Sequence, residues 1–160
     1  MNYETRMALH DQAALNKVLG QPDDQLTDSS KSRIANATET LLEYMLFADE
    51  APLHGPIEGS SEFAAEYRRR GPRSRRGLSL RALDLKTRLF RYPCSPLIYA
   101  DAFDDLPAPA RDRIYQRLWD ILSGKDDSKM YERLSKTDRR AILEILMDTK
   151  SGLPAYWKRE

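Results

Sequence analysis

Hydrophobic residues recur along most of this chain at the three- or four-residue spacing that places them on one face of a helix. Long alternating runs of β-branched residues, which strands favour, are missing. We therefore expect an all-α fold, a single irregular bundle of about six to seven short-to-medium helices. The expected helices cover residues 3–19, 31–48, 62–70, 79–92, 97–103, 109–122 and 136–149, with one more helical turn around residues 130–134.

Residues 79–92 are expected to form the central helix of this bundle. Ser79 is a suitable N-cap, and Pro93 stops the helix because a proline disfavours helical geometry in the residue before it. Projection at about 100° per residue places apolar side chains on two sides, and such a helix is usually packed between neighbours. One side carries Leu78, Leu85, Leu89 and Tyr92, and the other carries Leu80, Leu83 and Phe90.

The first two helices are expected to form an antiparallel hairpin, because the segment between them is short. Gly20 is a natural helix-ending residue, and Pro22 prevents the helix from continuing. The first helix should pack through one apolar face, which carries Tyr3, Met7, Ala14, Leu15 and Val18.

The length of 160 residues fits one helical domain, which we expect to span residues 1–160. Two prolines and two glycines interrupt residues 49–61, so this segment is either a surface loop or a hinge between two subdomains. The first expected helix begins almost at Met1, which suits a domain excised from a larger protein. The block from Gly77 to Tyr99 resembles the C-terminal part of larger bacterial proteins, a resemblance that implies no function and no site.

Charge and composition bear on several classes of protein. Twenty-six basic residues against 25 acidic ones give a net charge of +1, which argues against a generally basic nucleic-acid coat protein but leaves a local patch open. One cysteine allows no internal disulfide and leaves the redox compartment undecided. No apolar run approaches the roughly 18 residues of a membrane span, and the N-terminus lacks a signal-peptide segment, so the expected location is the cytoplasm by default.

Six arginines fall within the ten residues 68–77, where two glycines and a proline interrupt helical structure. A planar guanidinium binds pairs of oxygen atoms, so this loop is a candidate site for phosphates, nucleic acid or an acidic protein surface. The alternative is a solvated loop whose arginines pair with the chain's own carboxylates, such as Asp104 and Asp105. The candidate anion- or partner-binding residues are Arg70, Arg73, Arg75, Arg76, Arg81, Arg88 and Arg91.

The last three of these arginines share one side of the expected helix 79–92 with Asp84. Asp84 and Arg88 are four residues apart, so we expect them to form an ion pair. On a central helix these groups form either a buried network that fixes the packing, or part of a site whose missing partner is a ligand carboxylate or phosphate.

Candidate catalytic chemistry is limited to Cys94, which precedes an expected helix N-terminus that would lower the pKa of its thiol. A thiol enzyme also needs a base, and the two histidines, His10 and His54, are remote in sequence. A cysteine that fills a turn between packed helices is the simpler interpretation. Metal-ligand spacings, glycine-rich phosphate loops and serine nucleophile motifs are missing, so we expect no metal, no cofactor and no catalytic residue.

These observations predict a non-enzymatic helical interaction or structural domain, which packs against another protein or against other domains of a parent chain. Tyr156 and Trp157 are the aromatic residues expected to remain exposed for such a partner, although the tail should also dock rings against the bundle. The alternative is a module that binds anions or nucleic acid through the arginine-rich loop 68–76. A third hypothesis is a thiol-dependent enzyme centred on Cys94.

Overall fold

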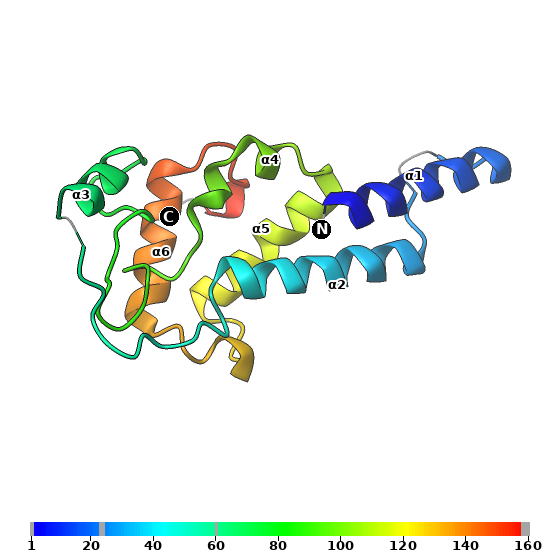
Figure 1. Cartoon of the computed structure of the whole chain (residues 1–160). Coiled ribbons are helices and arrows are strands. Elements are labelled where there is room, and N and C mark those ends of the chain that lie inside the picture. The colour runs from blue at the N-terminus through cyan, green and yellow to red at the C-terminus, as the bar shows by residue number, and fades with distance from the viewer. Residues whose placement is uncertain (1, 23–24, 60, 158–160) are drawn as a thin grey trace.

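The computed structural model describes residues 2–22, 25–59 and 61–157, and over these ranges the chain is all-α (Figure 1). They contain six α-helices and three short 3-10 helices, and no strand beyond an isolated bridge between Leu83 and Phe90. None of the helices described is long and apolar enough to cross a membrane. The α-helices are α1 (Asn2–Leu19), α2 (Asp28–Met45), α3 (Ser61–Arg69), α4 (Asp101–Asp104), α5 (Ala108–Ser123) and α6 (Lys136–Thr149), and the 3-10 helices are η1 (Pro96–Tyr99), η2 (Lys129–Tyr131) and η3 (Ala155–Trp157).

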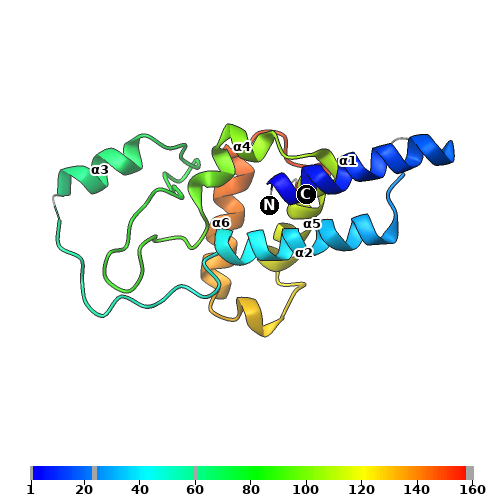
Figure 2. The same ribbon diagram turned by 45° about the vertical axis from the view of Figure 1, so that its right-hand side comes forward.

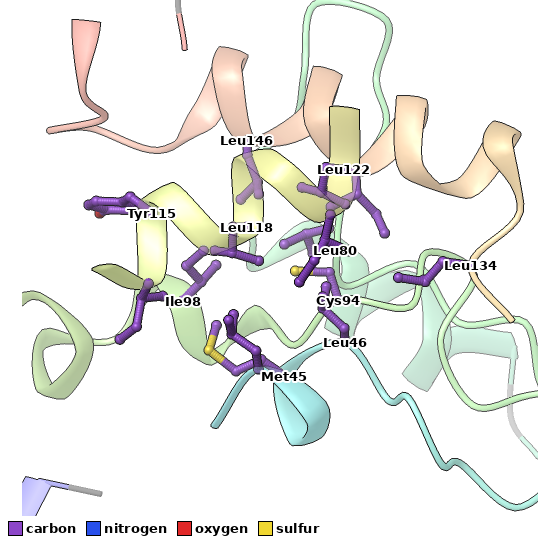
Figure 3. Packing of buried hydrophobic residues seen from close by; sticks show 14 of the residues in the cluster. Met45, Leu46, Leu80, Cys94, Ile98, Tyr115, Leu118, Leu122, Leu134 and Leu146 are labelled. Carbon is purple, nitrogen blue, oxygen red and sulfur yellow. The ribbon is translucent and has the colours of Figure 1, made fainter. Parts of the chain in front are cut away.

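The core forms around α5, against which α2 and α6 both pack. Four residues of α5 at helical spacing, Ala110, Ile114, Leu118 and Ile121, are fully buried. A buried Leu or Ile side chain contributes about 1.5–3 kcal/mol relative to an exposed one, so this face of α5 anchors the bundle. Figure 3 shows side chains from α2, α5, α6 and the connecting loops meeting in one cluster.

Helix boundaries follow the capping residues. The Thr27 side chain accepts a hydrogen bond from the backbone N–H of Ser30 at the start of α2, and Ser135 accepts one from Asp138 at 3.0 Å at the start of α6. Gly124 takes a φ of 81° directly after α5, a left-handed conformation that glycine adopts without steric cost. The predicted helices 3–19, 31–48, 62–70, 109–122 and 136–149 are confirmed to within a few residues.

The prediction of a central helix at residues 79–92 was wrong, because these residues form an irregular segment with a tight hairpin-like turn. Backbone hydrogen bonds cross the turn from Asp84 N to Leu89 O at 3.0 Å and from Arg91 N to Ala82 O at 2.8 Å. Leu85 lies at the turn with a φ of 60°, outside the range of a right-handed helix. The central position in the bundle belongs instead to α5.

The carboxylate of Asp84 explains why a turn replaces the helix. It accepts hydrogen bonds from the backbone N–H groups of Thr87 at 3.1 Å and Arg88 at 3.3 Å, and from the Thr87 hydroxyl at 2.5 Å. Such side-chain bonds offer the backbone an alternative to helical hydrogen bonding. Of the two predicted apolar strips, only Leu80 is fully buried, whereas Leu89 is 39% exposed.

Residues 49–59, within the segment predicted as a loop or hinge, run beside this turn. The backbone N–H of Leu53 donates to Thr87 O at 3.3 Å, and that of Ile57 donates to Leu85 O at 2.8 Å. Two segments without regular structure therefore support each other, and together with α3 they form one end of the molecule (Figures 1 and 2).

The segment 97–103 and the C-terminal tail are both short pieces packed on the bundle. Residues 97–103 form η1 and α4, separated by the extended residue Ala100, rather than one helix. In the tail, Trp157 is 1% exposed and contacts the Tyr115 and Trp119 rings at centroid distances of 6.2 and 5.6 Å. The prediction that the tail docks a ring is therefore confirmed, while the expected exposure holds only for Tyr156, which is 43% exposed.

Helices α1 and α2 form the expected antiparallel hairpin, which projects from the rest of the bundle in both views (Figures 1 and 2). The prediction of which face of α1 is buried was wrong. The buried residues are Ala8, Gln12 and Asn16, which are 1%, 3% and 0% exposed. The predicted apolar face lies in solvent, and we call it the α1 stripe: Tyr3 (76% exposed), Met7 (38%), Leu15 (44%) and Val18 (82%), with the exposed Ala14.

Hydrogen bonds of two buried amides explain this orientation of α1. Gln12 Oε1 accepts from the Ser30 hydroxyl at 2.8 Å, and Gln12 Nε2 donates to Asn16 Oδ1 at 2.7 Å. Asn16 Nδ2 donates to the backbone oxygens of Pro22 and Gln25, both at 2.8 Å. A buried amide without partners is costly, so these two side chains turn toward α2 and the connecting loop. Polar contacts, rather than apolar burial, set the rotation of the helix.

Candidate functional site

Positive charge is concentrated in residues 62–91, which we call the basic segment. It holds ten of the chain's 26 basic residues but only three of its 25 acidic ones, so the remainder of the chain has more acidic than basic residues. The segment comprises α3 and the irregular structure after it, at one end of the molecule (Figure 2). The molecule therefore has one strongly basic end, although its net charge is only +1.

Two of the predicted arginines are bound to carboxylates of α6. Arg75 places Nε 3.6 Å from Asp148 Oδ1, and its backbone N–H donates to Asp148 Oδ2 at 2.9 Å. Arg76 Nη1 donates to Glu144 Oε2 at 3.0 Å. The carboxylates are only 11% and 12% exposed, but the arginine side chains are 88% and 73% exposed. These pairs hold the basic segment against α6 and leave the guanidinium groups partly open to solvent.

Arg88 also reaches α6, and it does not form the predicted ion pair with Asp84. Its side-chain Nη2 lies 3.3 Å from Asp138 Oδ2, while only its backbone N–H donates to Asp84. Hydrogen bonding from the Thr87 hydroxyl, the largest cause, outweighs burial and lowers the pKa of the Asp84 carboxyl. These three arginines thus pair with α6 rather than with Asp104 or Asp105. Asp104 is bound to the buried Lys150, with Nζ and Oδ1 2.5 Å apart.

Arg81 is held by contacts with α3 and the residues after it. Its guanidinium carbon lies 5.0 Å from the centre of the Tyr67 ring, a cation–π arrangement. Its side chain also lies so close to Gly71 that a Cβ there would be 2.6 Å from Arg81 Cδ. Arg81 Nε is buried, and among the residues described it has no hydrogen-bond partner. Arg81 therefore belongs to the packing of the basic segment.

Arg70, Arg73 and Arg91 complete the predicted set. Arg70 Nε donates to Glu66 Oε1 at 3.1 Å within α3. Arg73 and Arg91 are exposed, and their side chains have no hydrogen bond or ion pair within the described part of the chain. Arg75 and Arg88 line two separate hollows of 540 and 160 Å³. The guanidinium groups most available to an external anion are those of Arg73 and Arg91.

Cys94 lies in the core rather than at a reactive surface. Its side chain is 0% exposed, and burial raises the pKa of its thiol to about 12. Both histidines are exposed, His10 in α1 and His54 in the segment beside the turn. No cluster of three His, Cys, Asp or Glu side chains able to hold a metal ion occurs among the residues described.

Arg139 is a structural residue that the sequence did not indicate. Its guanidinium donates hydrogen bonds to four backbone oxygens, those of Leu134 at 3.1 Å, Asp126 at 3.0 Å, Tyr131 at 2.9 Å, and Ile121. It thereby joins the end of α5, the loop after it and the start of α6. Helical spacing carries no signal for this role, because the acceptors belong to the backbone.

Arg117 of α5 forms a second charged junction. Nε and Nη2 bind the two oxygens of Glu39 in α2 at 2.6 and 3.0 Å, and Nη2 also binds Asp126 Oδ2 at 2.7 Å. Burial favours a higher pKa for the Asp126 carboxyl, but hydrogen bonds from the Ser128 backbone and from Arg117 outweigh it and lower the pKa. The junction ties α2, α5 and the following loop together.

Three connected hollows surround the end of α2, and we call them together the groove. Its walls are residues 43–52 and 129–134, with Thr87, Arg88 and Pro93. The first hollow, of 160 Å³, is mainly apolar and shares Phe47 and Glu50 with the second, of 310 Å³. The second shares Glu43 and Asp49 with the third, of 370 Å³. Sequence patterns cannot indicate this surface, because segments about eighty residues apart form it.

No family model, no curated protein and no solved structure matches this chain. Three surfaces of the described residues are candidates for a function: the α1 stripe, the basic segment and the groove.

Proposed function

We propose that this chain is a non-enzymatic helical domain that binds another protein through the α1 stripe. The observation that carries the proposal is the rotation of α1, which buries Gln12 and Asn16 while Tyr3 and Val18 are 76% and 82% exposed. Single exposed apolar residues are common on proteins. Five on one face of one helix form a strip that the exposed Asp11 interrupts, and such strips mark interaction surfaces.

The internal hydrogen bonds make this surface a stable feature of the fold. The amides of Gln12 and Asn16 now bind α2 and the connecting loop. A rotation of α1 that buried the stripe would break these hydrogen bonds and leave the amides exposed or without partners. The chain therefore gains more from keeping its polar residues inside, and the apolar face is left for a partner. Burial of such area contributes roughly 25 cal/mol per Å² before the entropy cost of association.

The test compares the wild type with one double variant and one control variant in the native host. The double change Leu15→Gln and Val18→Gln removes apolar character from the stripe, and Lys17→Gln alters an exposed residue of the same turn on another face. We expect cross-linked affinity purification to recover a stable partner with the wild type and with the Lys17 variant, but not with the double variant. All three chains should keep the same thermal midpoint. A partner retained equally by the double variant contradicts the proposal.

A second candidate function, the binding of an anionic polymer, is supported by the concentration of charge in the basic segment and by the availability of Arg73 and Arg91. Each phosphate contact with a single-stranded nucleic acid contributes about 0.7 to the slope of log affinity against log salt concentration. We expect the double change Arg73→Ala and Arg91→Ala to reduce this slope by about 1.4 for a single-stranded oligonucleotide. The control, Arg113→Ala with Lys125→Ala, removes the same charge elsewhere. No binding at low salt would contradict this function.

A further inference from the structure

The groove is a concave surface that shares no residue with the α1 stripe, and its three hollows differ in chemistry. The apolar hollow of 160 Å³ adjoins an acidic recess of 310 Å³, and the third hollow, of 370 Å³, is lined by both acidic and basic side chains. We propose that the groove binds a segment of a partner protein in which an apolar side chain lies within a few residues of a Lys or Arg. This inference goes beyond the proposed function, because it concerns a different surface.

The apolar hollow has the size and lining of a pocket for one side chain. Leu46, Phe47, Pro93, Tyr131 and Leu134 provide its walls. A cavity of about 150 Å³ in a protein core accommodates a benzene ring, so a volume of 160 Å³ suits one aliphatic or aromatic side chain. Apolar anchors that fill such pockets carry much of the binding energy of protein interfaces.

Positive side chains at the rim of this hollow are already engaged within the chain. Arg88 binds Asp138, and Arg133 Nη1 donates to the backbone oxygen of Glu50 at 2.7 Å. Both arginines at the rim therefore already have partners, and they require no acidic group from the occupant. The adjoining Met130 is 49% exposed and extends the apolar surface with a flexible side chain.

The acidic recess determines the charge of the occupant. Its lining consists of Glu43, Tyr44, Phe47, Asp49 and Glu50, three carboxylates and two aromatic rings with no basic residue. Glu50 Oε1 accepts a hydrogen bond from the backbone N–H of Leu89 at 3.2 Å. The carboxylates of Glu43 and Asp49 have no hydrogen bond or ion pair within the described ranges, and Tyr44 is 75% exposed. A Lys or Arg side chain matches this lining through charge and through cation–π contact.

The backbone holds the groove in a fixed shape. Phe47 directly follows the C-cap of α2 and takes a φ of 51°, a left-handed conformation that bulky residues rarely adopt. Hydrogen bonds from Ala48 N to Glu43 O at 2.9 Å and from Ser95 N to Met45 O at 2.7 Å secure the turn, and the Phe47 ring stacks on Phe90 at 5.3 Å. A surface already held in its binding shape loses less entropy when a segment docks.

The experiment selects random twelve-residue peptides on display particles against the full chain. We expect enrichment of peptides that carry an apolar residue near a Lys or Arg. The strongest peptide, made synthetically and labelled, should lose about tenfold in affinity to Glu43→Gln with Asp49→Asn, and a similar amount to Tyr44→Ala. Because these three residues are at the surface or partly exposed, all variants should fold. The control is Glu58→Gln with Asp101→Asn, which removes equal charge from exposed positions outside the groove.

Three outcomes would overturn the inference. One is a selection without enrichment of basic residues beside apolar ones. A second is a selected peptide whose affinity the groove variants and the control change equally. The third is concentration-dependent self-association of the wild type that Glu43→Gln abolishes, because the occupant would then be the basic segment of a second copy. Variants of the α1 stripe should leave peptide binding unchanged, so failure of the two proposals can be told apart.

Discussion

Arg139 shows how strongly one polar side chain can organise this chain. Its guanidinium is half-buried and donates to four backbone oxygens, two of which, those of Ile121 and Tyr131, also accept from backbone N–H groups. Hydrogen bonds that involve a charged group contribute more than neutral ones, and a buried oxygen left without a donor costs about 1–3 kcal/mol. The loop between α5 and α6 is therefore held by this residue as well as by its buried apolar side chains, Tyr131 and Leu134.

The change Arg139→Met tests that dependence. It keeps an unbranched side chain but removes every donor, so we expect the free energy of unfolding to fall by about 3 kcal/mol. Urea denaturation measures the loss. Arg140→Met, at the exposed neighbouring position, should change the stability by less than about 0.5 kcal/mol. Equal effects of the two changes would mean that the four hydrogen bonds contribute little.

At the scale of elements, local signals predicted the regular helices well. Apolar spacing and capping residues placed α5 and α6 because both features act within a few residues of one another. The same spacing failed at residues 79–92, where the Asp84 carboxylate binds the following backbone and closes a turn.

Local sequence patterns could not predict which face of α1 is buried or which carboxylates bind the arginines. An apolar face predicts burial only if nothing else competes for the interior, and in α1 the amides of Gln12 and Asn16 compete successfully. Arg75 and Arg76 could be recognised as a candidate site from composition. Their carboxylate partners on α6 are about seventy residues away, so the pairing appears only once the chain is folded.

Asp84→Ala distinguishes the observed turn from a helix by the sign of its effect. In a helix, alanine would be favoured over aspartate by about half a kcal/mol. In the turn, the change removes the hydrogen bonds to Thr87 and Arg88, so we expect a loss of about 1 kcal/mol in unfolding free energy. Urea denaturation at neutral pH measures the difference, and a gain in stability would contradict the turn.

At the scale of the whole molecule, buried titratable groups limit stability at high pH. Burial raises the pKa of Cys94, Tyr115 and Tyr131 to about 12 each. In the unfolded chain these groups lose their protons nearer pH 9 or 10. Between these values and pH 12 the unfolded chain binds fewer protons than the folded one, so stability decreases as the pH rises.

The expected slope is at most about 1.4 kcal/mol per pH unit for each of the three groups, and their contribution is fully present below pH 9. Urea midpoints measured from pH 8 to pH 11 should therefore be level at first and then fall. Absorbance of the tyrosinate form near 295 nm provides the control. Phenolates of buried tyrosines that appear near pH 10, while the fold persists, would contradict the assignment.

The three surfaces lie on different parts of the whole molecule. The α1–α2 hairpin and the basic segment lie at opposite ends of the molecule (Figure 1). The hairpin carries the α1 stripe, and the groove lies where α2 ends. The core around α5 holds these parts in place, and the proposed function assigns the principal docking role to the stripe.

The most direct measurement of that role places a photo-crosslinking amino acid at position 18 of the full chain in its native host. Val18 is 82% exposed on the α1 stripe, and the matched control places the same group at the exposed position 17, on another face of the helix. The account predicts one defined adduct, identifiable by mass spectrometry, from position 18 and little or none from position 17. No adduct from position 18, or equal adducts from both positions, would contradict the claim that the α1 stripe is a protein-binding surface.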